Sequence, residues 1–300
     1  MYDIIVVGGG PAGMTAALYG LRNGKSVLVI EKKGFGGQIT YSPRVENIPG
    51  FESVSGNEFA DKFMTQIMNQ GAELEFEEVI GIRKEDDRFI VDTAEGSHFE
   101  GRSIVLATGV KHRMLGLEGE KELVGQGISF CSVCDGDFYT GKKVVVAGGG
   151  NSALQEAILL ADKCSEVVML QDMPEFTGEK KLQEKLFAKS NVSAYTNTKI
   201  KGLLTESGKL VGVEINSNGE DSFVDCDGMF VAIGLIPENE AFAELADLNS
   251  YGYFDSDESC KTKTPGIFVA GDARSKRIRQ VSTAAADGAI AALAACEYLR

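Results

Sequence analysis

Histidine is scarce in this chain of 300 residues, and most of its cysteines stand alone. The two histidines are His98 and His112, and of the six cysteines only Cys131 and Cys134 lie close together, two residues apart. A closed zinc site needs four nitrogen or sulfur ligands, and no second pair of ligands accompanies these two thiols. We therefore expect no bound metal, and we interpret the pair as a redox-active disulfide.

Long apolar runs are also missing. The N-terminus, Met1 to Asp3, carries no basic residue and leads directly into a short apolar stretch, Ile4 to Val7. No run is long enough to cross a bilayer, and the start does not resemble a signal peptide. We expect a cytoplasmic protein without a membrane partner. In that reducing compartment a Cys-x-x-Cys pair is more often catalytic than structural.

Positively charged residues are also relatively few. The chain has 30 lysines and arginines and 44 aspartates and glutamates, which gives a formal net charge of -14. Binding to nucleic acid phosphates requires a basic face, so we exclude nucleic acid as a partner. The length suits two domains of ordinary size, and a hydrophobic content of 43% is typical of globular proteins.

Glycine, by contrast, is concentrated in informative places. A β-branched stretch at 4–7 runs into Gly8-Gly9-Gly10-Pro11-Ala12-Gly13, and a helical stretch follows at 14–24. The next apolar run, 26–30, ends in Glu31, about 20 residues beyond the loop, where an acid can bind a ribose hydroxyl. Such a loop lets the backbone approach a pyrophosphate at a helix N-terminus. The segment is predicted to bind a dinucleotide.

The same pattern restarts in the middle of the chain. A strand is predicted at 143–147, followed by a glycine loop at 148–153 and a helix to about Lys163. A further buried strand near 266–270 ends in Gly271-Asp272. We predict an α/β fold with two Rossmann-like three-layer domains, one inserted in the other. The outer, nucleotide-binding domain comprises residues 1–111 and 239–300, and the inserted domain comprises residues 112–238.

Together these motifs resemble the low-molecular-weight thioredoxin reductases, which are class II pyridine nucleotide-disulfide oxidoreductases. The resemblance extends over essentially the whole chain. It is carried, in order, by Gly8 to Gly13, Gly36-Gly37-Gln38, Glu46 to Gly50, Ala107-Thr108-Gly109, Cys131 to Gly136, Gly271-Asp272-Ala273 and Arg279-Gln280-Val281.

The resemblance implies an FAD-containing homodimer that reduces thioredoxin. It places the FAD pyrophosphate on the first glycine loop, the adenosine ribose on Glu31, the ribityl and phosphate region on Asp272, and the isoalloxazine near 279–281. The cofactor-binding residues implied are Gly8, Gly10, Pro11, Ala12, Gly13, Glu31, Lys32, Gly37, Gln38, Asn47, Val79, Ala107, Thr108, Gly109, Gly271, Asp272, Arg279, Gln280 and Val281.

The resemblance also assigns roles to the dithiol. Cys134 would accept electrons from the flavin, and Cys131 would attack the disulfide of thioredoxin as a thiolate. Asp135, the next residue, is placed to move a proton to or from a thiol. An alternative interpretation makes Asp135 a residue at the start of a helix, which would itself lower the pKa of a neighbouring thiol.

The inserted domain departs from the family pattern after its second strand. NADPH-dependent members carry a His-Arg-Arg cluster there for the 2'-phosphate, whereas this chain has Gln171 to Gly178, with Asp172 and Glu175, and no arginine between Arg113 and Arg274. We therefore do not expect NADPH to be used. Reduced ferredoxin is the favoured donor, as in ferredoxin-dependent flavin thioredoxin reductases. NADH, bound through Asp172, is the second candidate, and NADPH bound in an unusual way or a small molecule the third.

Ferredoxins are generally acidic, so a donor of that kind needs a basic docking surface. The segment Arg274 to Arg279 holds four positive charges and is the candidate, although a solvated turn is the alternative interpretation. Two other functions stay open, a ferredoxin-NADP reductase-like flavoprotein and a redox sensor. The dithiol argues against the first, and steady turnover with thioredoxin would exclude the second.

Overall fold

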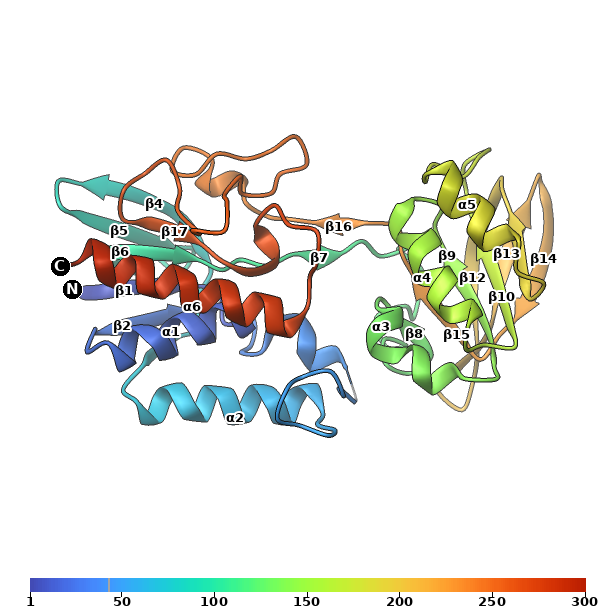
Figure 1. The fold of residues 1–300 in the computed structure, drawn as a ribbon, viewed down its shortest axis with the longest axis horizontal. Helices are drawn as coiled ribbons and strands as arrows, with labels where there is room; N and C mark the ends of the chain where they lie inside the picture. Colours follow the sequence, from blue (N-terminus) through green and yellow to red (C-terminus); the bar gives the residue numbers. More distant parts are fainter. Residues whose placement is uncertain (43) are drawn as a thin grey trace. The chain divides into compact units, whose positions relative to one another are not determined.

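The computed structural model describes residues 1–42 and 44–300, which form two compact units. The first unit comprises Met1–Lys111 and Ile236–Arg300, and the second comprises His112–Leu235 (Figure 1). The second unit ends at Leu235, whereas the sequence analysis placed the end of the inserted domain at residue 238. Glu238 belongs with the first unit because its carboxylate forms ion pairs with Lys32 and Lys111.

A mixed sheet forms the centre of the first unit. Its order is β3-β2-β1-β6-β5-β4, and β17 pairs in parallel with the second half of β6. The strands β1, β2, β3, β6 and β17 pair in parallel with one another, while β5 pairs antiparallel with both β6 and β4. The strand bounds are β1 Tyr2–Val7, β2 Val27–Ile30, β3 Glu73–Glu75, β4 Val79–Glu85, β5 Arg88–Thr93, β6 His98–Leu106 and β17 Ile267–Val269.

Both faces of this sheet are covered. Ile4 and Val6 of β1 pack with residues of α1 and α6, and Figure 1 shows these two helices running beside each other. Ile5 and Val7 point to the opposite face and pack with Phe254 and its neighbours. A strand buried on both faces reads as a continuous apolar run, which is why the sequence identified it. The helices are α1 Pro11–Arg22, α2 Gly56–Asn69 and α6 Val281–Tyr298, with short 3-10 turns η1 Gly37–Tyr41, η3 Glu240–Phe242 and η4 Gly271–Ala273.

The second unit has three layers. A parallel sheet, β11-β10-β9-β15-β8, carries α4 and α5 on one face and an antiparallel three-stranded sheet, β12-β13-β14, on the other. The bounds are α3 Ser132–Asp135, η2 Gly136–Tyr139, α4 Asn151–Ala161, α5 Lys180–Phe187, β8 Ile128–Ser129, β9 Lys143–Ala147, β10 Glu166–Leu170, β11 Val192–Tyr195, β12 Thr198–Glu206, β13 Lys209–Ser217, β14 Glu220–Asp225 and β15 Gly228–Val231. The short strands β7 Lys111–His112 and β16 Leu235–Ile236 pair where the chain enters and leaves this unit.

The two units repeat one local design. In each, a parallel strand leads through a glycine loop into a helix, and the first loop amide is bonded to the end of the next strand: Gly8 N to Ile30 O at 2.8 Å, and Gly148 N to Leu170 O at 2.9 Å. The predicted fold class is confirmed. The sequence analysis did not identify α2 or the antiparallel sheet β12-β13-β14.

Candidate active site

At two positions of the first glycine loop, neighbouring backbone atoms leave no room for a side chain. Gly8 has φ +110°, and a Cβ there would lie 2.3 Å from the carbonyl oxygen of Ala107. A Cβ on Gly13 would lie 1.8 Å from Gly8 O, so the helix can start here only with glycine. Gly10 differs, because a Cβ there would meet nothing within 4 Å. The space beside Gly10 is therefore free for a ligand.

Glu31 lies directly after β2, at the edge of the sheet where the loop sits. Its Oε2 accepts a hydrogen bond from Gly9 N at 2.7 Å, and its Oε1 accepts one from Lys33 N at 2.8 Å. The neighbouring Lys32 forms ion pairs with Glu78 and Glu238, each at 3.1 Å. The acid predicted to bind a ribose is thus held against the glycine loop.

Several other predicted cofactor residues gather at the same edge. Gly37, with φ +63°, approaches the Gly10 backbone so closely that a Cβ would lie 3.2 Å from its Cα. Gln38 donates to the Val110 carbonyl at 3.0 Å, and the Thr108 hydroxyl donates to Asn239 at 2.7 Å. These contacts join segments far apart in the sequence. The remaining predicted residues of this group are Pro11 and Ala12 at the start of α1, Val79 at the start of β4, and Ala107 and Gly109 directly after β6.

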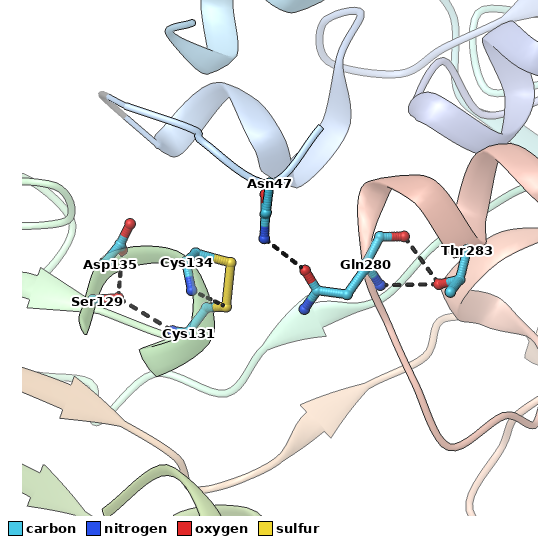
Figure 2. Close-up of a disulfide and its surroundings, with 7 residues drawn as sticks. All are labelled: Asn47, Ser129, Cys131, Cys134, Asp135, Gln280 and Thr283. Carbon is cyan, nitrogen blue, oxygen red and sulfur yellow. Dashed lines mark hydrogen bonds between the residues drawn. A yellow bond between two sulfur atoms is a disulfide. The ribbon is translucent and has the colours of Figure 1, made fainter. Parts of the chain in front are cut away.

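The segment after β17 supplies the other predicted residues. Asn47 donates from its amide to Gln280 Oε1 at 3.1 Å, and Gln280 caps α6 through reciprocal bonds with Thr283 (Figure 2). Val281, the first residue of α6, packs on a small apolar cluster that includes Phe51. The polar ends of these side chains meet where α6 begins.

Asp272 is the most unusual group in this unit. Its Oδ1 is buried without a hydrogen-bond partner, and burial raises the pKa of the carboxyl to about 6. The preceding Gly271 has φ +78° and lies so close to Ala12 that a Cβ would come within 2.7 Å of the alanine Cβ. A buried acceptor without a donor is costly, so Asp272 is suited to accept a hydrogen bond from a bound hydroxyl or amide.

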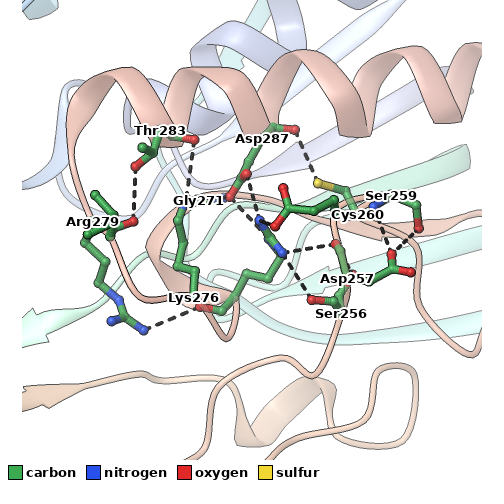
Figure 3. Close-up of polar contacts among 12 residues, drawn as sticks. Ser256, Asp257, Ser259, Cys260, Gly271, Lys276, Arg279, Thr283 and Asp287 are labelled. Atoms are coloured by element: carbon green, nitrogen blue, oxygen red, sulfur yellow. Dashed lines mark hydrogen bonds and ion pairs between the residues drawn. The ribbon is translucent and has the colours of Figure 1, made fainter.

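The basic segment 274–279 is not the exposed docking surface that we predicted. The side chains of Arg274 and Lys276 are buried and pair with Asp287 of α6 at 3.0 and 2.8 Å (Figure 3). Arg279 packs over the Tyr253 ring, 4.4 Å from its centroid, and donates to the Asp272 carbonyl. Arg277 is the one exposed cation of this described segment. The prediction is wrong because Arg274 and Lys276 are buried against Asp287, and Arg279 is held by Tyr253 and the Asp272 carbonyl.

This ion cluster gives a prediction about stability. In Asp287→Ala the buried cations of Arg274 and Lys276 would lose their common partner, and Gly271 N would lose its acceptor, 3.0 Å away. We expect the free energy of unfolding to fall by about 3–5 kcal/mol, measured by chemical denaturation of the flavin-free protein. Glu258→Gln is the control, because Glu258 also approaches Arg274 but is 91% exposed. An Asp287→Ala protein as stable as Glu258→Gln would contradict a structural role for the cluster.

The predicted dithiol is a disulfide in the structure. Cys131 and Cys134 are joined with a Cα–Cα distance of 5.3 Å, and Cys131 is the N-cap of α3, accepting from Cys134 N at 3.2 Å. The Ser129 hydroxyl connects the motif to its acid: it accepts from Cys131 N at 3.1 Å and donates to Asp135 Oδ2 at 2.6 Å (Figure 2).

Asp135 is the last residue of the four-residue helix α3, lies within its first turn and is also the N-cap of η2, so the alternative interpretation as a residue at the start of a helix fits the structure as well. Burial raises the pKa of its carboxyl, and the hydrogen bond from Ser129 partly opposes that shift. Its Oδ1 is buried without a partner. A carboxyl of this kind holds its proton at a higher pH than usual, which suits proton exchange with a thiol.

The other four cysteines are buried and free, as is common for cysteines that act as small apolar residues: Cys164, Cys226, Cys260 and Cys296. Among residues 1–42 and 44–300, no group of three or more histidines, cysteines or acids is arranged to hold a metal ion. No helix of the same described residues is both long and apolar enough to cross a membrane.

The second glycine loop is covered by the chain itself. Thr177 N and Gly178 N donate to Gly149 O at 2.9 and 3.0 Å. At the first residue of α4, Asn151 accepts from Glu179 N at 2.7 Å and donates to the Glu179 carboxylate at 3.1 Å. The exposed Glu179, which is the N-cap of α5, therefore places its carboxylate against the Asn151 side chain beside the start of α4, close to where a nucleotide pyrophosphate would bind.

The structure also changes which residue corresponds to Glu31. The residue directly after β10 is Gln171, and a Cβ on Gly149 would lie 2.5 Å from its amide nitrogen, much as Gly9 contacts Glu31. Gln171 is buried and donates to the Glu175 carbonyl at 3.2 Å. Asp172, the residue assigned to the ribose in the second candidate, NADH, is exposed one position further on.

Sequence reasoning missed several residues of both sites. Ser129 holds Asp135 and the dithiol, and Asn239, fully buried, joins Thr108 to the carbonyls of Gly252 and Ala273. A serine two residues before the first cysteine is a signal that a search for acid–dithiol contacts could have used. No local pattern marks Asn239, because its partners lie as far as 131 residues away.

A sequence profile described as pyridine nucleotide-disulphide oxidoreductase matches residues 2–288. The chain belongs to this family. Within it, the chain is 36% identical to a thioredoxin reductase of Listeria monocytogenes over 100% of this chain and 94% of that protein, and 37% identical to one of Bacillus subtilis over 100% and 95%. The crystal structure of thioredoxin reductase from Streptococcus pyogenes superposes with a TM-score of 0.94 at 35% identity, covering 100% of this chain and 98% of the other.

Each of these three similarities exceeds 30% identity over nearly the full length of both proteins. The chain is therefore a flavoprotein disulfide oxidoreductase of the thioredoxin reductase type. The names of these relatives say nothing about the electron donor.

Proposed function

We propose that this protein reduces oxidised thioredoxin, with electrons reaching the Cys131–Cys134 disulfide from FAD held in the first unit. The observation that carries the proposal is the disulfide at the start of α3 with Asp135 fixed beside it by Ser129. Cys131 attacks the thioredoxin disulfide as a thiolate, which forms a mixed disulfide and releases one thioredoxin thiolate. Cys134 then attacks Cys131, which restores the protein's own disulfide and releases the second thiolate.

The proton balance of this exchange requires an acid near the dithiol. Each cysteine must lose a proton to react, and the two thioredoxin thiolates must gain one each. Asp135 can take up and return such a proton because burial raises its pKa. This gives the acid predicted from the sequence a defined place in the reaction.

The residues of the first unit fit an FAD. The open space beside Gly10 suits a pyrophosphate, Glu31 lies where a ribose is bound, and the unpartnered Asp272 can accept from a flavin chain hydroxyl. Bound there, a flavin supplies the ability to take electrons one or two at a time. The chain's own contribution is to hold it through the segments 8–13, 37–47 and 271–281. A homodimer and a cytoplasmic location, both expected from the resemblance or the composition, stay predictions.

For the electron donor, the comparisons and the geometry favour different candidates. The family name, pyridine nucleotide-disulphide oxidoreductase, favours NADPH or NADH over ferredoxin. The second glycine loop argues the other way: the Glu179 carboxylate contacts Asn151 at the start of the helix that follows the loop, and Gln171 stands where an acid would bind a ribose. On this geometry we propose ferredoxin as the donor, with a nicotinamide as the second candidate. Lys180 and Lys181, at the start of α5, are the nearest cations in sequence that a 2'-phosphate could use.

An anaerobic titration of the flavin absorbance distinguishes these donors. With reduced ferredoxin we expect the flavin to bleach at rates that match turnover with thioredoxin, and with NADPH or NADH we expect bleaching at least about 100-fold slower. Rapid bleaching by a nicotinamide would make the second candidate correct.

Glu179→Gln sharpens the same experiment, because glutamine keeps an acceptor for Asn151 but removes the negative charge. If a nicotinamide does reduce the flavin, the KM for it should fall in this variant with little change in kcat, since only repulsion of the phosphates is relieved. Asp172→Asn is the matched control, because Asp172 is exposed and is not the counterpart of Glu31.

A further inference from the structure

Buried polar atoms without partners are concentrated beneath the dithiol. Among the residues that the structure describes, four side-chain oxygens are buried without a hydrogen-bond partner. One is Asp272 Oδ1, already assigned to the flavin segment. The other three lie on α3 and on α4, which packs against it: Ser132 Oγ, Asp135 Oδ1 and Glu156 Oε2. Orphaned polar atoms are rare in proteins, so three on one pair of packed helices require an explanation.

Glu156 is the titratable member of this group that the reaction described above does not use. It lies on α4, and its carboxyl is hydrogen-bonded to the backbone of Ser132, the residue directly after Cys131. Its Oε2 is inaccessible to solvent. An ionised carboxylate in this position would leave one charged oxygen without a donor, whereas a protonated carboxyl avoids that cost.

We propose that Glu156 is a positioning residue of the dithiol whose neutral carboxyl holds the first amide of α3, and whose charge state is coupled to that of Cys131. The inference rests on the proposed function, because it concerns the same disulfide. When the Glu156 carboxyl is neutral, a thiolate at Cys131 meets no negative charge from α4. When the carboxyl ionises, its negative charge repels that thiolate. A thiolate forms only in the reduced protein, so the reduced protein binds a proton at Glu156 more tightly than the oxidised protein does.

The local electrostatics agree with this assignment. Burial raises the pKa of the Glu156 carboxyl to about 8, and the hydrogen bond with Ser132 partly opposes the shift. Those two causes account for the shift without a charged partner. The titratable groups on the elements packed against α4 are Cys131, Cys134 and Asp135 at α3, Asp137 and Tyr139 on η2, Lys143 on β9, Glu166 on β10, and Lys180, Lys181, Glu184 and Lys185 on α5.

Reduction of the disulfide breaks the S–S bond, takes up two electrons and yields two thiols only with two protons. The coupling applies where Cys131 is a thiolate, so at alkaline pH a proton bound at Glu156 replaces the one that Cys131 has lost. Between the pKa of Glu156 in the oxidised protein and its higher pKa in the reduced protein, reduction should bind up to about one more proton than it does in a protein without this carboxyl. Below about pH 7 the carboxyl is neutral in both states and the additional proton disappears.

The test is the pH dependence of the disulfide's midpoint potential in the full-length holoprotein, measured against dithiol redox buffers from pH 6 to 10. The slope gives the number of protons bound per disulfide reduced. We expect wild type and Glu156→Gln to agree below pH 7, and wild type to bind more protons above pH 8. Glu184→Gln, an exposed acid of the same unit, should follow the wild type. Identical slopes for wild type and Glu156→Gln at every pH would overturn the proposal.

A second readout does not depend on the potential. A glutamate with a raised pKa favours folding at low pH, and this contribution is lost as the pH rises from the unfolded value near 4.5 to the folded value of about 8. The melting temperature of wild type should therefore fall relative to that of Glu156→Gln over this window. An equal pH dependence of the two melting curves would also count against the proposal. A disulfide that never cycles would instead contradict the proposed function.

Discussion

Cys134→Ser is expected to lower thioredoxin reduction by about three orders of magnitude or more while leaving reduction of the flavin by its donor intact. The thiol of Cys134 is needed both to receive electrons into the disulfide and to release thioredoxin from Cys131. Without it, Cys131 can still attack the thioredoxin disulfide, but nothing resolves the mixed disulfide. The variant should therefore accumulate a covalent complex, seen on a non-reducing gel, whereas Cys131→Ser should form none.

Val133→Ala is the matched control for this experiment. Val133 lies between the two cysteines on α3 and is 58% exposed, so its replacement should leave turnover nearly unchanged. A Cys134→Ser protein that still turns over thioredoxin would mean that electrons bypass the disulfide. A flavoprotein that acts on small acceptors alone would also show no loss, and the same assay would detect it.

Gly13→Ala is expected to have the second large effect, on flavin binding and on stability together. The new Cβ would lie 1.8 Å from the carbonyl oxygen of Gly8, so the loop and the start of α1 must move apart. Overpacking of this kind costs about 1–3 kcal/mol and occasionally more. Because the loop is then displaced from the position that accepts a pyrophosphate, the purified protein should contain only traces of FAD, measured by absorbance after denaturation.

Gly10→Ala separates packing from ligand binding at the same loop. A Cβ at Gly10 meets nothing within 4 Å, and its φ of -76° is accessible to alanine, so the flavin-free protein should be as stable as wild type. The affinity for FAD should still fall, because the added methyl group occupies the space beside the loop. Full FAD content in Gly13→Ala, or unchanged affinity in Gly10→Ala, would contradict the placement of the cofactor.

The parts of both sites that could be predicted are those encoded over short stretches of sequence. The loop at 8–13 and the acid Glu31 are recognisable because a strand, a turn and a helix follow one another directly, and the pair Cys131 and Cys134 is recognisable from its two-residue spacing. The resemblance then supplied the residues near 38–47 and 271–281. Their contacts with one another, such as Asn47 with Gln280, could not be derived from the sequence, because they join residues 233 positions apart.

The wrong predictions arose because neither the burial of a charge nor the exact end of a strand can be read from the sequence. Arg274 and Lys276 look like a solvated basic patch in the sequence, but Asp287, on the next helix, draws both into the interior. Asp172 looks like the acid of the second fingerprint, but the register of β10 gives that position to Gln171. The role proposed for Glu156 was equally hidden, since its hydrogen-bonding partner is a backbone group of a different helix.

Within each glycine loop, the first and the middle glycine are required for different reasons. The first glycine of each is required by the adjacent strand: a Cβ would lie 2.3 Å from Ala107 O at Gly8 and 2.5 Å from Ala232 O at Gly148. These positions would be retained by natural selection even in a descendant that had lost its nucleotide. The middle glycines, Gly10 and Gly150, have no backbone atom in their way. In genome surveys of such duplicated folds, the middle glycine is therefore the position whose loss or retention would indicate whether a loop still serves a ligand.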